Sequence, residues 1–237
     1  MGVLAFGDSI TNGGGELQWG VALQSWALWV ARALGLAFTS YATDGACVAD
    51  VVAFQLTEFE RRSAHPNARY DLGCLYIGVN DVRAFDWDRE PFERDFRTAL
   101  EFLIARCERV LTLTAPLDLG RPRAGAKVRE LNATIAAVAR ERLALVLDLR
   151  DFGARNLVMP DHVHPTAFGQ IAIAERALAT LREDGLPAHV QPSSLISYGP
   201  TPRERLLHDT RYLYRHAKVS ARAALIHVRD ALLALRC

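Results

Sequence analysis

The sequence reads VLAFGDSIT over residues 3–11, and this stretch joins an apolar run to a polar turn. Consecutive apolar residues closed by a glycine are typical of a strand that is buried on both faces. Ser9 follows at the strand-to-loop turn, where its hydroxyl can be exposed. We therefore expect a buried strand that presents a reactive side chain at its carboxyl end.

Apolar runs and amphipathic segments alternate along the rest of the chain. We expect strands over residues 3–6, 37–42, 72–77, 110–114 and 143–149. We expect helices over residues 19–34, 50–62, 91–104, 124–142 and 166–182, where apolar residues recur at helical spacing. Strands and helices that alternate in this way form a parallel sheet that helices cover on both faces. The chain is thus predicted to be an α/β protein.

Composition sets the class of protein. The chain has 237 residues, of which 50% are hydrophobic and 23% charged, with a formal net charge of +1. This length can form one large core, or one core with an appendage. A net charge near zero argues against a nucleic-acid partner. Since no apolar stretch reaches the ~18 residues that span a bilayer and no signal peptide precedes the first strand, we expect no stable membrane insertion and a cytoplasmic location.

Polar motifs follow the predicted strands. They are Gly7-Asp8-Ser9, Asp44-Gly45, Gly78-Val79-Asn80-Asp81 and Asp161-His162-Val163-His164-Pro165. Because the carboxyl ends of parallel strands meet at one edge of a sheet, we expect all four motifs to converge there.

These residue types suit acyl transfer to a serine. Ser9 can be the nucleophile, His164 the base that takes its proton, and Asp161 the carboxylate that orients the imidazole. The backbone N–H groups of Ser9 and Gly45 and the side-chain amide of Asn80 can donate hydrogen bonds to an oxyanion. A glycine at position 45 lets the backbone approach the substrate closely.

Taken together, the four motifs resemble the sequence blocks of the SGNH, or GDSL-type, hydrolase family. The family is named for a Ser, a Gly, an Asn and a His, which match Ser9, Gly45, Asn80 and His164. The resemblance covers about residues 1–185. It implies a flavodoxin-like three-layer α/β/α fold with a five-stranded parallel sheet. It also implies a metal-independent esterase or lipase without an organic cofactor, with the roles assigned above.

Other interpretations of these residues stay open. Ser9 can simply cap a helix, and Asn80 can be a turn residue. His162 competes with His164, and Asp161, His162 and His164 together could form a metal site, although no further clustered ligand is apparent. Asp44 places a carboxylate beside an oxyanion donor, which would oppose catalysis unless it points away.

Several neighbouring residues are assigned structural or substrate-facing positions. We expect Asp8 and Asp81 to hold their loops through hydrogen bonds to backbone amides. We expect Trp19, Trp26 and Trp29 to lie in the core or in a pocket wall. The loop that holds Phe85, Asp86, Trp87 and Asp88 either shapes substrate choice or is a plain surface loop.

The carboxyl-terminal part departs from the strand–helix pattern. We interpret residues 1–190 as the catalytic domain and residues 191–237 as a linker followed by a basic amphipathic helical extension. The extension has eight Arg or Lys against three acidic residues. It could be a helical hairpin that packs on the catalytic domain or across a dimer, an interfacial membrane helix, or a lid over the acyl site. We favour the first, which allows a homo-oligomer through these helices.

The expected function is hydrolysis of a small-molecule carboxylic ester through an acyl-serine intermediate. The acyl group can be small, such as acetyl, or the substrate can be a lipid or carbohydrate ester. An acyltransferase with the same triad and a catalytically silent ligand-binding protein of the same fold are the alternatives. The sequence leaves the acyl chain open, because deacetylation of sugars needs a small acyl pocket and a polar cleft, whereas lipid cleavage needs a long apolar channel.

Overall fold

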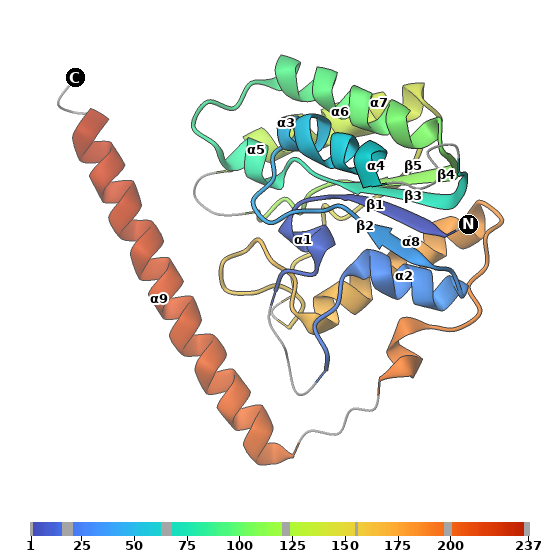
Figure 1. Cartoon of the computed structure of the whole chain (residues 1–237). Coiled ribbons are helices and arrows are strands. Elements are labelled where there is room, and N and C mark those ends of the chain that lie inside the picture. Colours follow the sequence, from blue (N-terminus) through green and yellow to red (C-terminus); the bar gives the residue numbers. More distant parts are fainter. Residues whose placement is uncertain are drawn as a thin grey trace.

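A five-stranded, all-parallel sheet forms the centre of the computed structural model (Figure 1). The structure describes residues 2–15, 21–62, 68–119, 124–154, 156–196 and 201–234. The strands are β1 (Val3–Gly7), β2 (Phe38–Ser40), β3 (Tyr70–Tyr76), β4 (Cys107–Leu113) and β5 (Leu145–Leu147), in the order β2-β1-β3-β4-β5. The order doubles back at β1, which pairs with β2 on one side and with β3 on the other. Ser9 therefore follows the central switch point of the sheet, where α/β proteins bind ligands.

Helices cover both faces of the sheet and complete three layers. Helices α2 (Trp26–Leu34) and α8 (Ala167–Glu183) lie together on one face, and α4 (Leu56–Arg62), α6 (Arg89–Ile104) and α7 (Lys127–Glu141) lie on the other (Figure 1). This architecture confirms the predicted flavodoxin-like α/β/α fold. These helices leave the carboxyl ends of the strands uncovered. The polar motifs that follow the strands lie at this edge.

An aromatic cluster joins the sheet to the α4–α6 layer. The ring of Phe59 in α4 packs edge-to-face on Phe6 of β1, with centroids 6.3 Å apart, and on Phe102 of α6, with centroids 5.5 Å apart. Phe6 and Phe59 are fully buried. Edge-to-face pairs add roughly 0.5–1.5 kcal/mol beyond the burial of their area. The strand that leads to Ser9 is thus anchored directly in the core.

The first long helix begins later than predicted. The sequence pattern suggested a start at residue 19, but residues 21–25 are not helical and α2 begins at Trp26. The reason is local, because the Ser25 hydroxyl accepts a hydrogen bond from the Ala27 N–H at 3.2 Å and caps the helix. Trp26 and Trp29 lie in the core as expected, and Trp19 lies outside the described residues.

Short and irregular helices were not predicted. Helix α1 (Ser9–Asn12) and helix α5 (Val79–Arg83) each follow a polar motif directly. The predicted helix over residues 50–62 is present, but it starts as α3 (Val48–Asp50) and contains a π-helical stretch, η1 (Val51–Gln55), before α4. Single π turns of this kind are frequent at functional sites.

The chain ends in one long helix rather than a helical hairpin. A 3₁₀ turn, η2 (Pro192–Leu195), follows α8, and α9 spans Pro202–Ala234 as a single element. Figure 1 shows α9, in red, running alongside the α/β layers on the side where α1 and α5 lie. No helix among the described residues is both long enough and apolar enough to cross a lipid bilayer.

Candidate active site

Three side chains form a continuous chain of hydrogen bonds at the carboxyl edge of the sheet. The Oγ atom of Ser9 lies 2.8 Å from Nε2 of His164, and Nδ1 of the same ring lies 2.7 Å from Oδ2 of Asp161. Ser9 begins α1, two residues after the end of β1, whereas the other two come from the loop before α8. The structure thus brings together residues that are 155 positions apart in the chain.

The loop that carries the imidazole is ordered by its own carboxylate. Oδ1 of Asp161 accepts hydrogen bonds from the N–H groups of Val163, at 2.9 Å, and His164, at 3.0 Å. The second carboxylate oxygen, Oδ2, accepts a hydrogen bond from the imidazole ring of His164. Asp161 therefore holds the backbone and the side chain of His164 together, which fixes the orientation of the imidazole.

Electrostatics favour charge separation between these two residues. Burial opposes ionisation of Asp161, but its hydrogen bonds from the His164 ring and from the two backbone N–H groups outweigh burial and lower its pKa. The hydrogen bond that the His164 ring donates to Asp161 raises the pKa of His164, and burial partly opposes this rise. An imidazolium that forms at His164 is thus stabilised beside a carboxylate.

Asp8 is a buried carboxyl group directly before Ser9. Its side chain accepts a hydrogen bond from the Ile10 N–H at 2.9 Å and caps α1, as the sequence led us to expect. Burial raises its pKa to about 7, against the lowering effects of that hydrogen bond and of His164. Asp81 has a comparable structural role, because its two oxygens accept from the Val48 N–H at 3.0 and 3.2 Å.

The three expected oxyanion donors come from the start of α1, from the turn that holds Gly45 and from α5. Ser9 is the first residue of α1, directly after the cap at Asp8. Gly45 has a φ of 77°, and a Cβ built on it would meet no atom within 4 Å, so the space above it is open. One N–H of the Asn80 side chain donates to the Ala46 carbonyl at 2.9 Å, which ties Asn80 to the Gly45 loop.

The carboxylate of Asp44 has a partner. Its Oδ1 atom accepts a hydrogen bond from the Asn12 side chain at 2.9 Å, in an exposed setting. An exposed, hydrogen-bonded carboxylate is screened by solvent, which weakens the repulsion that its position in the sequence suggested.

Buried carboxamides hold the backbone around the site, and the sequence analysis missed them. Gln55 accepts from the Gly7 N–H at 3.0 Å and donates to the Gly7 carbonyl at 2.8 Å. Gln170 accepts from the Trp26 N–H at 2.8 Å and donates to the carbonyls of Ile10 and Gly14 at 3.0 and 3.1 Å. The sequence does contain a signal for their burial, because each glutamine stands alone among apolar residues on a helix.

A third carboxamide supports the loop after β4. Asn132 of α7 accepts from the Ala115 N–H at 2.7 Å and donates to the Ala115 carbonyl at 2.8 Å. Asn132 is buried, like Gln55 and Gln170. Each of the three satisfies backbone groups that would otherwise be buried without partners.

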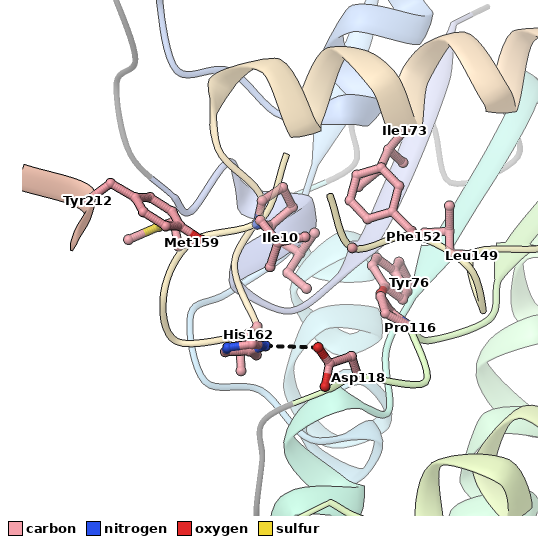
Figure 2. A pocket seen from close by; sticks show the side chains of 14 residues that line it. Ile10, Tyr76, Pro116, Asp118, Leu149, Phe152, Met159, His162, Ile173 and Tyr212 are labelled. Carbon is pink, nitrogen blue, oxygen red and sulfur yellow. Dashed lines mark hydrogen bonds and ion pairs between the residues drawn. The ribbon is translucent and has the colours of Figure 1, made fainter. Parts of the chain in front are cut away.

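His162 faces a different side from His164. Its Nδ1 atom lies 3.1 Å from Oδ2 of Asp118, and its backbone has a φ of 57°, which is unusual outside glycine (Figure 2). The two histidines therefore do not share one site. Among the residues that the structure describes, no three His, Cys, Asp or Glu side chains are grouped as metal ligands.

A narrow cavity of about 30 Å³ borders this loop (Figure 2). Its lining is mostly apolar and includes Ile10, which follows Ser9, and Val163, which precedes His164. Tyr212 of α9 contributes to the lining and lies beside Met159 in Figure 2. Helix α9 thus reaches the vicinity of the site.

A wider hollow borders the loop after β3. It has a volume of about 310 Å³. Its lining includes the carboxylates of Asp81, Asp86, Asp88 and Asp95 and the ring of Trp87. The loop after β3, which the sequence left as either substrate-facing or plain surface, therefore forms one wall of a hollow.

The sequence matches one family model over most of its length. The model of the GDSL-like lipase/acylhydrolase family matches residues 5–171, which include every motif described above. The chain belongs to this family. As a GDSL-like lipase/acylhydrolase, it is a carboxylic ester hydrolase that acts on small-molecule substrates. No curated protein sequence gives a significant match.

Solved structures share the fold of this GDSL-like hydrolase. An acetylxylan esterase from Geobacillus stearothermophilus is 19% identical, with a TM-score of 0.58 over 76% of this chain and 93% of that chain. A member of the lipolytic G-D-S-L family from Veillonella parvula is 23% identical, with a TM-score of 0.60 over 75% of this chain and 96% of that chain. An α/β hydrolase enzyme from the metagenome of Lake Arreo is 19% identical, with a TM-score of 0.58 over 75% and 93% of the two chains.

Proposed function

We propose that this GDSL-like hydrolase cleaves carboxylic esters through an acyl-serine intermediate, with Ser9 as nucleophile, His164 as general base and Asp161 as the residue that orients and stabilises the imidazole. The observation that carries this proposal is the unbroken chain of hydrogen bonds from Ser9 Oγ to His164 Nε2, at 2.8 Å, and from His164 Nδ1 to Asp161 Oδ2, at 2.7 Å. This is the arrangement that nucleophile activation requires.

The proposed reaction has two halves. The Ser9 hydroxyl attacks the ester carbonyl while His164 takes its proton, and the alcohol then leaves with that proton. Water attacks the resulting acyl-serine, with His164 again as the base, and releases the carboxylic acid. Asp161 stays ionised throughout and stabilises the imidazolium, in keeping with its lowered pKa.

The negative charge on the carbonyl oxygen needs donors in each half of the reaction. We assign this role to the N–H groups of Ser9 and Gly45 and to the side chain of Asn80. A primary amide has two N–H groups. One of those of Asn80 holds the Ala46 carbonyl, so the second is the candidate donor to substrate. The open space above Gly45 leaves room for the reacting carbonyl.

The two hollows support a short acyl group on a polar alcohol. The cavity next to Ile10 has a volume of only about 30 Å³, too little for a long chain, whereas the hollow with the four carboxylates measures about 310 Å³. Carboxylates and a tryptophan can bind hydroxyl groups and sugar faces. The acetylxylan esterase among the structural neighbours acts on an acetylated carbohydrate, as its name states. We therefore propose acetyl or similarly short esters of hydroxyl-rich alcohols as substrates.

We also propose that residues 1–190 form the catalytic unit and residues 191–237 an extension. The family match ends at residue 171, and α8 ends at Glu183. The extension is not separate from the site, because Tyr212 contributes to the apolar cavity.

The decisive experiment combines kinetics with labelling. Hydrolysis of p-nitrophenyl esters from acetate to palmitate is measured for the wild type, for Ser9→Ala and for Ser193→Ala as a matched control on an exposed turn. We expect the wild type to prefer the shortest esters, Ser193→Ala to match it, and Ser9→Ala to lose at least about 1000-fold in kcat. A phosphonate inhibitor should add to the peptide that contains Ser9. A wild type that is inert on every ester, or an active Ser9→Ala, would overturn the proposal.

A further inference from the structure

Helix α9 carries a row of exposed apolar side chains. Leu206, Leu207, Leu213, Tyr214 and Leu225 are each between 59% and 70% exposed. At 100° per residue, these positions fall within an arc of roughly 120° of the helix surface. An exposed apolar face of this kind marks an interaction surface rather than scattered surface leucines.

The opposite side of the helix faces the α/β layers. Tyr212 contributes to the apolar cavity beside the His164 loop (Figure 2). Both Tyr212 and Val219, seven residues later, are half-buried. Residues seven apart lie on the same side of a helix. Helix α9 therefore faces the catalytic layers with the side that holds Tyr212, and its leucine face points outward.

A row of cations runs beside the leucine face. Arg211, Arg215, Lys218 and Arg222 are all exposed, and their spacing of four, three and four residues places them on one stripe. From Thr210 to Leu225 the sequence contains no Asp or Glu. The face thus combines apolar side chains with an uninterrupted positive edge.

This charge pattern discriminates between possible partners. In an antiparallel pair of two copies, equivalent edges meet, so Arg211 and Arg222 of one copy would lie near the same positive row of the other. Like charges in that position disfavour association. An anionic lipid surface instead offers acyl chains to the leucines and phosphate groups to the cations.

We propose that α9 is an interfacial helix that binds anionic membrane surfaces through its exposed leucine face and the row of Arg211, Arg215, Lys218 and Arg222. The helix lies in the plane of the headgroups, with its apolar side chains at the boundary of the acyl chains. Since α9 runs along the side of the molecule where α1 lies, binding holds the edge of the sheet that carries Ser9 close to the membrane (Figure 1).

Vesicle sedimentation of the full chain tests this inference. The probes are vesicles of phosphatidylcholine with phosphatidylglycerol and vesicles of phosphatidylcholine alone, each at low and high salt. We expect the wild type to sediment with the anionic vesicles at low salt, to be released by high salt, and to bind the neutral vesicles at least about tenfold more weakly, because each cation near an anionic surface strengthens binding roughly fivefold.

Matched variants separate what the cations of α9 contribute to vesicle binding from what its leucines contribute. One variant changes Arg211, Arg215, Lys218 and Arg222 to Gln, and its control changes four exposed cations on other elements, Arg61, Arg62, Arg94 and Arg150, to Gln. A second changes Leu206, Leu213 and Leu225 to Ser, and its control changes the exposed Phe54, Leu143 and Leu195 to Ser. We expect both α9 variants to lose vesicle binding by at least about tenfold and both controls to keep it.

Activity on a water-soluble ester without vesicles shows that each variant is folded, and all four should retain it. Wild-type protein that does not bind anionic vesicles would overturn the inference, as would α9 variants that bind like their controls. A stable dimer in lipid-free solution that dissociates in the Leu206, Leu213 and Leu225 variant would also overturn it, because the leucine face would then be covered by a second copy.

Discussion

The side chain of Gln55 forms hydrogen bonds with both backbone groups of Gly7, two residues before Ser9. Oε1 accepts from the Gly7 N–H at 3.0 Å, and Nε2 donates to the Gly7 carbonyl at 2.8 Å and to Thr43 Oγ1 at 3.1 Å. Gln55 is the last residue of the π-helical stretch η1. An irregular turn in a helix on one face of the sheet thus sets the backbone from which the nucleophile projects.

Replacement of Gln55 by Leu should cost stability and activity. The change leaves the Gly7 N–H buried without this partner, whereas the Gly7 carbonyl still accepts from the Thr43 N–H at 3.1 Å, so we expect a loss of about 1–3 kcal/mol in the free energy of unfolding. Urea denaturation measures this loss, and kcat on an acetate ester should fall because Ser9 is less firmly placed. Thr57→Val, on the exposed side of the next helical turn, is the control and should remain close to wild type. An unchanged stability in Gln55→Leu would contradict the structural role.

The raised pKa of His164 predicts an acid limb in the pH profile. Only the neutral imidazole can accept the Ser9 proton, so kcat/KM should rise with pH. Because Asp161 raises the pKa of His164, half of the plateau should be reached above the ordinary value of 6.5. A profile of acetate-ester hydrolysis from acid to mildly alkaline pH checks this, and a limb below 6.5 would count against the arrangement.

The Asp161→Asn variant should separate orientation from charge. It removes the charge that stabilises the imidazolium, and we expect kcat to fall by about 10³- to 10⁴-fold. The acid limb should move to lower pH, because the pKa of His164 loses its main raising cause. A variant that is inactive merely through unfolding would show altered circular dichroism, whereas the predicted variant should keep the wild-type spectrum.

Asp8 should make the protein less stable as pH rises. The pKa of its carboxyl is about 7 in the folded state against an ordinary 3.8, so the folded protein keeps a proton that the unfolded chain releases between these values. Its contribution to stability is therefore fully present below pH 3.8 and is lost as the pH rises through about 7. Asp8→Asn stays neutral and can still cap α1. At about pH 8 its free energy of unfolding should exceed that of the wild type by up to about 4 kcal/mol.

Denaturation curves at several pH values test the Asp8 prediction. The difference between Asp8→Asn and the wild type should shrink towards zero as pH falls to about 4. A difference that stays constant with pH would show that the Asp8 carboxyl does not titrate abnormally.

Gly169 should tolerate no side chain, in contrast to Gly153. A Cβ at Gly169, in the first turn of α8, would lie 1.9 Å from the Leu157 carbonyl oxygen, whereas a Cβ at Gly153 would meet nothing within 4 Å. Gly169→Ala must displace the backbone that leads into the His164 loop, so we expect a loss of about 3 kcal/mol or more in stability and a lower kcat. Thermal melting should show no comparable loss for Gly153→Ala.

The sheet and the candidate triad could be predicted from sequence because each has a local signal. Apolar runs marked all five strands, and the spacing of Asp161 and His164 suited a single loop. Helix boundaries were less predictable, since the cap at Ser25 overrode the apolar spacing that suggested a start at residue 19. Helices α1 and α5 span four and five residues, too few to show a helical period.

The sequence pattern could not predict contacts between distant segments. The lone glutamines at positions 55 and 170 look like ordinary polar interruptions until the fold places them against Gly7 and Ile10. Likewise, the pairing of His162 with Asp118 depends on a backbone φ of 57° that no spacing rule indicates. Asp44 could be weighed only once its hydrogen bond with Asn12 was visible.

The buried carboxamides of Gln55, Gln170 and Asn132 have a consequence for how the molecule responds to its surroundings. An amide neither gains nor loses a proton across the physiological pH range, and these three are shielded from salt by burial. The framework around Ser9 therefore keeps one set of donors and acceptors while Asp8 and His164 change charge. Acidification can switch the chemistry off without loosening the parts that hold it, so the enzyme should regain its activity at once when neutral pH returns.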